Sequence, residues 1–187
     1  MAEEKNKQTI MSKSTKAQAD RVEDHAEAVL NVRRVAKVIK GGRRLAFSAL
    51  VVVGDRKGSV GVALGKSREV SSAIAKALRR ARKTMFTVPM YKTTVPFSVK
   101  GKHGASEVIL RSASKGTGVI AGGAVRAILE ALGVRDVLAK SVGPSTPHNV
   151  AMATFDALKK LRTAKQIAEL RGKTLKDLFG DKNVAAS

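Results

Sequence analysis

The chain has 187 residues, room for one medium domain or two small ones, and 43% of them are hydrophobic, which is enough for genuine cores. Its 36 lysines and arginines against 15 aspartates and glutamates give a formal net charge of +21. Such a charge concentrates polyanions and favours nucleic acid as the partner class. An anionic membrane is the second possibility, but no apolar run approaches the roughly 20 residues of a spanning helix, so we expect no membrane partner.

Cysteine is absent, which excludes disulfides, thiolate metal sites and cysteine nucleophiles and fits a reducing compartment. Residues 1 to about 24 are polar and have neither the apolar stretch of a secretory signal nor the acid-poor composition of a transit peptide. We therefore expect a cytoplasmic protein in which residues 1–25 form a disordered leader. A short helix over Ala17–Leu30 is the alternative for the end of this leader, because Val22, Ala26 and Leu30 have helical spacing.

Residues 26–89 carry the pattern of a small antiparallel meander. β-branched residues predict a strand over Asn31–Lys40, and Gly41-Gly42 predicts a two-residue turn. Alternating apolar residues predict further strands over Arg43–Val53 and Ser59–Leu64. A helix follows, with Ser67 as its expected N-cap and an apolar stripe of Val70, Ile74, Leu78, Ala81 and Met85. We expect a three-stranded sheet with one helix packed on it.

Residues 90–165 are expected to form a second, α/β domain, and residues 166–187 a basic tail. A hairpin is predicted from strands over Val95–Lys100 and Glu107–Leu110 with a turn at residues 101–104. Four glycines (Gly116, Gly118, Gly122 and Gly123) then lead into a helix over Ala121–Leu132 that ends at Gly133. The last predicted elements are a strand over Asp136–Val142 and a helix over Val150–Leu161 that turns Val150, Thr154, Phe155, Leu158 and Leu161 inward. The fold class is therefore α+β.

Charge is unevenly distributed along the chain. No acidic residue lies between Glu69 and Glu107, while eight basic residues do: Lys76, Arg79, Arg80, Arg82, Lys83, Lys92, Lys100 and Lys102. Because ordinary surfaces intersperse both signs, this contrast favours nucleic-acid contact over a solvated face. The hairpin tip Lys40–Arg44 adds two glycines for close backbone approach and cations for phosphates, with an ordinary tight turn as the alternative.

The composition also indicates how nucleic acid would be recognised. Aromatic residues make up only 3% of the chain and tryptophan is absent, so a stacking platform for single strands is poorly supplied. Arginine and lysine remain, and they suit recognition of folded, double-helical RNA through its backbone and shape.

A dinucleotide-binding loop is the main alternative for the glycine cluster. Residues 116–121 fit the pattern G-x-G-x-x-A, and Asp136 lies at the customary distance downstream. The ribose-binding acid of such a fold stands at the carboxyl end of its strand, whereas Asp136 precedes its predicted strand. His25, His103 and His148 have no metal-ligand spacing, and no nucleophile elbow is present. We therefore expect no cofactor, no metal site and no enzymatic activity.

The ordered succession of KGGR, VVGD, GKSREV, GTGVIAGG and VLAKS, between about Leu30 and Gly180, resembles the bacterial small-subunit ribosomal protein five family. The resemblance implies an amino-terminal domain similar to a double-stranded-RNA-binding domain and a small βαβ-type domain with a left-handed crossover. It also implies a structural constituent of the small ribosomal subunit that binds small-subunit rRNA and contacts ribosomal proteins four and eight. Further implications are a position along the mRNA entry path and a contribution to translational accuracy. No homo-oligomer is expected.

Several residues can be carried over by position. Ala36, Lys37, Lys40, Gly41 and Gly42 match the family's hairpin loop, which reaches the hinge between the head and body of the subunit near the spectinomycin site. Ala36 stands where other members have serine and has no hydroxyl to offer. We predict rRNA contacts from Arg33, Arg34, Lys37, Lys40, Gly41, Gly42, Arg43, Arg44 and Lys66. Gly118 and Arg126 match positions at the interface with ribosomal protein four, where changes relax accuracy, so the resemblance makes the glycine cluster a protein–protein surface.

Two other hypotheses remain at this point. One is a free-standing regulator that binds duplex RNA, and the other is an enzyme that uses a dinucleotide or cleaves RNA. Saturable nucleotide binding to Gly116–Gly123 would favour the enzyme.

Overall fold

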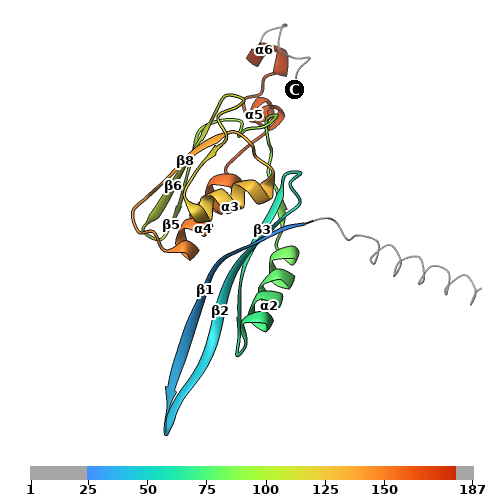
Figure 1. The fold of residues 1–187 in the computed structure, drawn as a ribbon. Helices are drawn as coiled ribbons and strands as arrows, with labels where there is room; N and C mark the ends of the chain where they lie inside the picture. Colours follow the sequence, from blue (N-terminus) through green and yellow to red (C-terminus); the bar gives the residue numbers. More distant parts are fainter. Residues whose placement is uncertain (1–24, 180–187) are drawn as a thin grey trace, which may run out of the picture.

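The computed structural model describes residues 25–179, which form two β-sheets flanked by helices (Figure 1). The strands are β1 (Ala26–Ile39), β2 (Gly42–Gly54), β3 (Ser59–Ser67), β4 (Phe86–Thr87), β5 (Val99–His103), β6 (Ser106–Ser112), β7 (Val119–Ile120) and β8 (Val137–Val142). The helices are α2 (Val70–Lys83), α3 (Gly123–Leu132), α4 (Pro147–Lys159), α5 (Ala164–Leu170) and α6 (Leu175–Phe179). The predicted α+β class is confirmed.

The first sheet is antiparallel and has the strand order β1-β2-β3-β4. It contains one strand more than the predicted three, because Phe86 and Thr87 pair with Val60 and Ser59. β1 starts at Ala26, so the helix considered for Ala17–Leu30 is wrong over residues 26–30. Pairing with β2 overrides the helical spacing there. The remainder of that helix and the leader lie outside the described residues.

Helix α2 packs on one face of the first sheet through three alanines, of which Ala81 belongs to the predicted stripe; Ile74, Leu78 and Met85 of that stripe are partly buried against the same cluster. Its buried residues are Ala73, Ala77 and Ala81, whereas Val70 is 38% exposed. The reason lies on β3, where a Cβ on Gly65 would stand 2.2 Å from the Ala73 carbonyl oxygen. Glycine opposite alanine lets helix and sheet approach closely. The predicted N-cap, Ser67, lies too early in the chain: Ser67 ends β3, and Glu69 is the N-cap.

The second sheet has the order β5-β6-β8-β7, with β7 and β8 parallel and the other pairs antiparallel. Helix α3 connects β7 to β8, which gives the predicted βαβ-type unit; the hand of this crossover stays a prediction. The hairpin of β5 and β6 turns at Gly104-Ala105 rather than over residues 101–104. Gly101 lies within β5, where a Cβ would stand 2.1 Å from the Ala153 carbonyl oxygen of α4.

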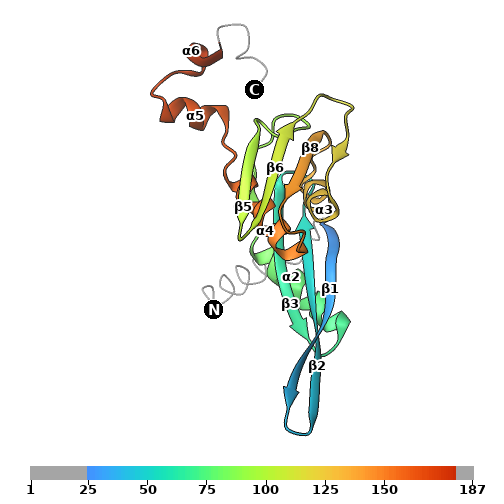
Figure 2. The ribbon, with the colours of Figure 1, turned by 90° about the vertical axis from the view of Figure 1, so that its left-hand side faces the viewer.

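One hydrophobic core joins the two sheets. Helix α3 lies on the face of the first sheet opposite α2 (Figures 1 and 2). Leu50, Val52 and Val60 of the first sheet belong to the same buried cluster as Ile128 and Leu129 of α3. The inward residues predicted for α4 are confirmed, since all five are buried. The domain boundaries at residues 26, 90 and 166 stay a prediction.

The turn between β2 and β3 anchors this contact. The amides of Arg56 and Gly58 donate to the carbonyl oxygens of Ala131 and Leu132 at 3.0 Å each. Gly133 caps α3 in the left-handed conformation with φ 95°, as predicted for a helix C-terminus. The C-terminal segment after α4 forms the two short helices α5 and α6. Within residues 25–179, no helix is long and apolar enough to cross a membrane.

Candidate nucleic-acid interface

The distal part of the β1–β2 hairpin projects beyond the rest of the first sheet (Figures 1 and 2). β3 pairs with β2 only from Phe47 to Gly54, so within the described residues β1 is the only strand beside residues 42–46. Every residue from Val32 to Leu45 is exposed, and Val38 reaches 75%. A two-stranded ribbon of this kind has no core of its own. Both of its faces are accessible to a partner.

The predicted cations are distributed over both faces of this ribbon. The register pairs Lys37 with Arg44, and Ser48 pairs with Arg33 on one side and Lys66 of β3 on the other. Directly paired residues point to the same face, and faces alternate along a strand. The face opposite α2 therefore carries Arg33, Lys37, Arg44 and Lys66, and the α2 face carries Arg34 and Arg43.

The tip turn consists of Lys40 and Gly41, one position earlier than predicted, because Ile39 and Gly42 form the last pair of the ladder. Gly41 has φ 88°, which glycine adopts without strain. A Cβ added at Gly41 would find no atom within 4 Å, so the backbone is open on its outer side. Open backbone flanked by Lys40 and Arg43 is the geometry that a phosphate contact requires.

The hairpin cations have no acidic partners within the described residues. The chain contains no aspartate or glutamate between Glu27 and Asp55. The ion pairs of the described residues lie elsewhere and join Arg82 to Glu27, Lys100 to Glu107, Arg126 to Glu130 and Lys160 to Asp156. The positive charge of the hairpin is therefore not neutralised by the acidic side chains of residues 25–179, which favours binding of a polyanion.

The acid-free span divides between two places in the fold. On α2, the Arg80 guanidinium donates to the Leu64 carbonyl oxygen at 3.1 Å and Arg82 pairs with Glu27 at 2.6 Å, so these two cations hold the helix to the sheet. Gly101 of β5 faces α4, so its strand neighbours Lys100 and Lys102 instead lie on the opposite face of the second sheet. Arg111 and Lys140 join them there through the strand register.

The predictions missed Arg111 and Lys140 as members of a cationic sheet face. The available signal was alternation: exposed residues of β6 and β8 alternate with the buried Leu110 and Val137. Alternation alone does not show which strands are neighbours, and the pairing of β6 with β8 across α3 is not visible in the sequence.

The glycine loop before β7 is closed by Asp136. The carboxylate oxygen Oδ1 accepts hydrogen bonds from the amides of Gly116 at 2.9 Å and Gly118 at 3.2 Å. The Thr93 hydroxyl and then these amides hold the pKa of the Asp136 carboxyl below its usual range. The loop therefore already has a bound anion, and that anion is a side chain of the protein. A phosphate at the same amides would meet like charge.

The position of the loop also excludes the dinucleotide interpretation. Gly118 precedes β7 and Asp136 precedes β8, and these strands are parallel. Both therefore lie at the amino ends of the parallel pair, whereas dinucleotides bind outside the carboxyl ends. The sequence argument from Asp136 is confirmed. Among the described residues, no group of three histidine, aspartate or glutamate side chains could hold a metal ion.

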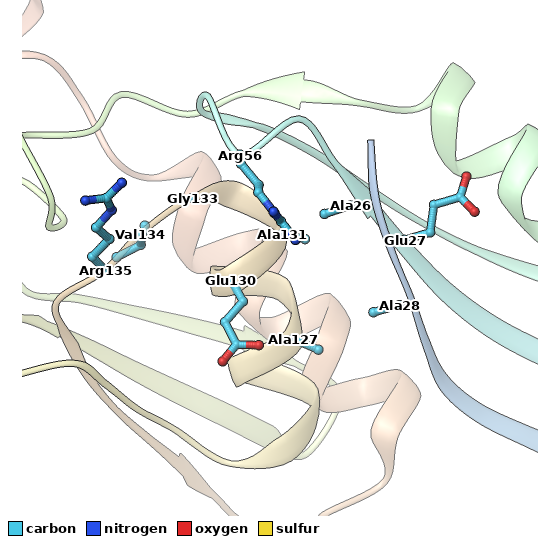
Figure 3. Close-up of a pocket in the computed structure, with 10 residues that line it drawn as sticks. All are labelled: Ala26, Glu27, Ala28, Arg56, Ala127, Glu130, Ala131, Gly133, Val134 and Arg135. Atoms are coloured by element: carbon cyan, nitrogen blue, oxygen red, sulfur yellow. The ribbon is translucent and has the colours of Figure 1, made fainter. Parts of the chain in front are cut away.

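A cavity of about 470 Å³ lies between the start of β1 and helix α3 (Figure 3). Much of its lining is small and apolar: Ala26, Ala28, Ala127, Ala131 and Gly133. Its charged side chains do not converge, since Glu27 points toward α2, where it pairs with Arg82, and Glu130 points away from Glu27 (Figure 3). A small-molecule site needs convergent polar groups, so this cavity is better described as a seam between the two halves.

Gly118 and Arg126 lie on either side of β7 and the start of α3, with Gly118 before β7 and Arg126 within α3. Gly118 has φ 76° and no atom near an added Cβ, and Arg126 is an exposed residue of the first half of α3. The Arg126 guanidinium Nε lies 2.7 Å from Glu130 Oε1, one helical turn onward. Both residues are accessible to a protein partner.

Comparison with known proteins decides the family. Residues 25–89 match the model of the ribosomal protein S5 N-terminal domain, and residues 101–171 match that of the ribosomal protein S5 C-terminal domain. The chain belongs to the ribosomal protein S5 family. It is 56% identical over 149 residues to the small ribosomal subunit protein uS5 of Lawsonia intracellularis, which covers 80% of this chain and 91% of the relative. The corresponding protein of Syntrophobacter fumaroxidans is 51% identical over 152 residues, covering 81% and 92%.

A third relative, from Rubrobacter xylanophilus, is 58% identical over 146 residues, covering 78% of this chain and 73% of its own length. Membership of the S5 family confirms the resemblance drawn from the sequence motifs. It assigns the chain to the small ribosomal subunit as a structural protein rather than an enzyme.

Proposed function

We propose that this member of the S5 family binds small-subunit rRNA through phosphate contacts made by the β1–β2 hairpin and the adjoining end of β3. The observation that carries the proposal is a projecting ribbon with six cations and no acidic partner among residues 25–179: Arg33, Arg34, Lys37, Lys40, Arg43 and Arg44. Exposed Val38 and Leu45 on the same ribbon suit a surface that a large partner covers.

The hairpin geometry favours reading of backbone and shape. The ribbon has two strands, and cations on both of its faces can contact phosphates on both sides. The open turn at Gly41 lets the RNA backbone approach closely. In a folded RNA, such a ribbon fits between helices rather than against one of them. This arrangement matches the family expectation that the loop reaches the hinge between the head and body of the subunit.

The proposal extends to protein partners. The surface made by Gly118 and Arg126 is assigned to ribosomal protein four, and it acts in translational accuracy. Contacts with ribosomal protein eight, a position along the mRNA entry path and a single copy per subunit complete the proposed assignment. These parts are supported by the family membership, by the exposure of Arg126 and by the open space beside half-buried Gly118.

The test is the salt dependence of RNA binding by a variant that carries Lys40→Ala, Arg43→Ala and Arg44→Ala. Each lost phosphate contact should reduce the slope of log affinity against log salt by about one. A matched control carries Lys165→Ala, Arg171→Ala and Lys173→Ala, which removes the same charge from the exposed C-terminal segment.

We expect a flatter slope for the hairpin variant on small-subunit rRNA and a smaller change for the control. Equal slopes for wild type and hairpin variant would refute contact by the tip, and equal affinity for arbitrary duplex RNA would favour a free-standing regulator.

A further inference from the structure

Asp136 is a charged residue in an unusual place. Only 4% of its surface is exposed, although it lies at the boundary between the glycine loop and β8. Burying a carboxylate is costly unless hydrogen bonds compensate it. Within the described residues no ion pair involves Asp136, so its partners must be polar groups of the surrounding backbone and side chains.

Three segments meet at this carboxylate. The first is the glycine loop, whose Gly116 and Gly118 amides donate to Oδ1. The second is the connection between the two sheets, where the Thr93 carbonyl oxygen accepts from the amides of Arg135 at 2.9 Å and Asp136 at 3.1 Å and the Thr93 side chain contributes to the lowered pKa of the carboxyl. The third is the start of β8, where the Val137 amide donates to the Gly118 carbonyl oxygen at 3.1 Å.

Packing does not hold the loop in place at its two key glycines. Gly116 has φ 94° and Gly118 has φ 76°, and a Cβ at either position would find no atom within 4 Å. The loop has one internal turn, in which the Thr117 amide donates to the Ser114 carbonyl oxygen at 3.2 Å. Two hydrogen bonds therefore fix the direction of the chain at Gly118: its amide donates to Asp136, and its carbonyl oxygen accepts from the Val137 amide.

We propose that Asp136 is the built-in counter-anion of the glycine loop and, through that loop, the positioning residue of the surface that meets ribosomal protein four. The proposal rests on the proposed function for its second part. Two amides of one short loop, those of Gly116 and Gly118, point at one oxygen, and such a concavity captures an external anion in other proteins. Here the carboxylate fills it, so the loop is preorganised before any partner arrives.

The experiment compares the full-length wild type with Asp136→Ala and Asp136→Asn. Amide hydrogen exchange at Gly116 and Gly118 measures the loop in the free protein, and binding to purified ribosomal protein four measures the surface. Asp55→Ala is the matched control, because Asp55 Oδ1 accepts from the Lys57 and Ser59 amides in a different turn. Asparagine keeps one side-chain oxygen as an acceptor without the charge, so it leaves the loop contacts largely possible.

We expect exchange at Gly116 and Gly118 to rise at least tenfold in Asp136→Ala, with exchange in the β1–β2 hairpin unchanged. The exchange rates of these two amides in Asp136→Asn should lie between those of Asp136→Ala and wild type, and Asp55→Ala should leave both rates unchanged. The affinity for ribosomal protein four should fall in the same order. Should Asp136→Ala fail to fold, the asparagine variant carries the test with the same two readouts.

The outcomes separate the two parts. Unchanged exchange at Gly116 and Gly118 in the folded asparagine and alanine variants would overturn the proposal. Suppose that the Asp136 variants exchange faster but bind ribosomal protein four normally, while Arg126→Ala weakens this binding. That result would overturn the positioning role of Asp136 and leave the proposed function intact. If Arg126→Ala also bound normally, the assignment of the interface itself would be wrong, and the anchoring of the loop by Asp136 would stand.

Discussion

Arg126 and Glu130 form an exposed pair one turn apart on α3, with the guanidinium 58% and the carboxylate side chain 52% exposed. Such a pair contributes about 0.3–0.5 kcal/mol to stability because water and salt screen it. The stability of the fold therefore does not depend on Arg126, and a functional effect of replacing Arg126 can be distinguished from an effect of unfolding.

Replacing Arg126 by alanine should leave the melting temperature and the rRNA affinity close to wild type while misreading in translation increases. The reason is that Arg126 faces outward from α3 and lies outside the hairpin. Lys160→Ala is the matched control, since Lys160 forms the same kind of pair with Asp156 on α4 at 2.6 Å. Misreading assays on cells that carry each variant make the measurement, and wild-type accuracy with Arg126→Ala would remove Arg126 from the interface.

At the scale of elements, Gly133 lies where the end of α3 contacts the β2–β3 turn of the first sheet. Its φ of 95° is unfavourable for alanine, and an added Cβ would stand 2.1 Å from the Arg56 carbonyl oxygen in the β2–β3 turn. The left-handed conformation alone costs alanine about 1–2 kcal/mol, and backbone displacement adds to this. Gly133→Ala should therefore lower the free energy of unfolding by more than Gly104→Ala, whose φ is 57° and whose Cβ meets only Asn149 at 3.8 Å. Denaturant unfolding of both variants measures this difference. Equal losses of unfolding free energy would mean that the β2–β3 turn moves away from the added Cβ without cost.

Much of the element order could be predicted because it depends on local patterns. Alternation identified β2 and β3, and Gly133 marked the end of α3. The start of β1 could not be predicted, since residues 26–30 become strand only through pairing with β2. Nor could the close packing of Ala73 and Ala77 of α2, because the glycine that admits them, Gly65, lies on β3.

The candidate site shows the same division. Charge and glycine content indicated the hairpin tip, and its register then showed which cations share a face. The hydrogen bonds of Asp136 come from Gly116 and Gly118, 20 and 18 residues earlier in the chain, and local patterns do not show that these residues meet. The sequence showed only that Asp136 precedes its strand. The partners named for Gly118 and Arg126 came from the family resemblance and from no local pattern.

At the scale of the whole molecule, the fold places a continuous core at its centre and an uncovered cationic ribbon at one end (Figure 1). A ribbon with this charge and no acidic partners is expected to find its counter-charge on assembly. The net charge of +21 makes that assembly sensitive to salt, because each phosphate contact releases counterions.

Sedimentation of the tagged chain from gently lysed cells, at low and then at high salt, tests the central claim most directly. We expect the wild type to travel in a one-to-one ratio with the small ribosomal subunit at low salt and to be released only at high salt. The hairpin variant with Lys40, Arg43 and Arg44 replaced by alanine should be released at lower salt than the C-terminal control. Wild-type protein that stays at the top of the gradient at low salt, or a hairpin variant released together with the control, would contradict the account.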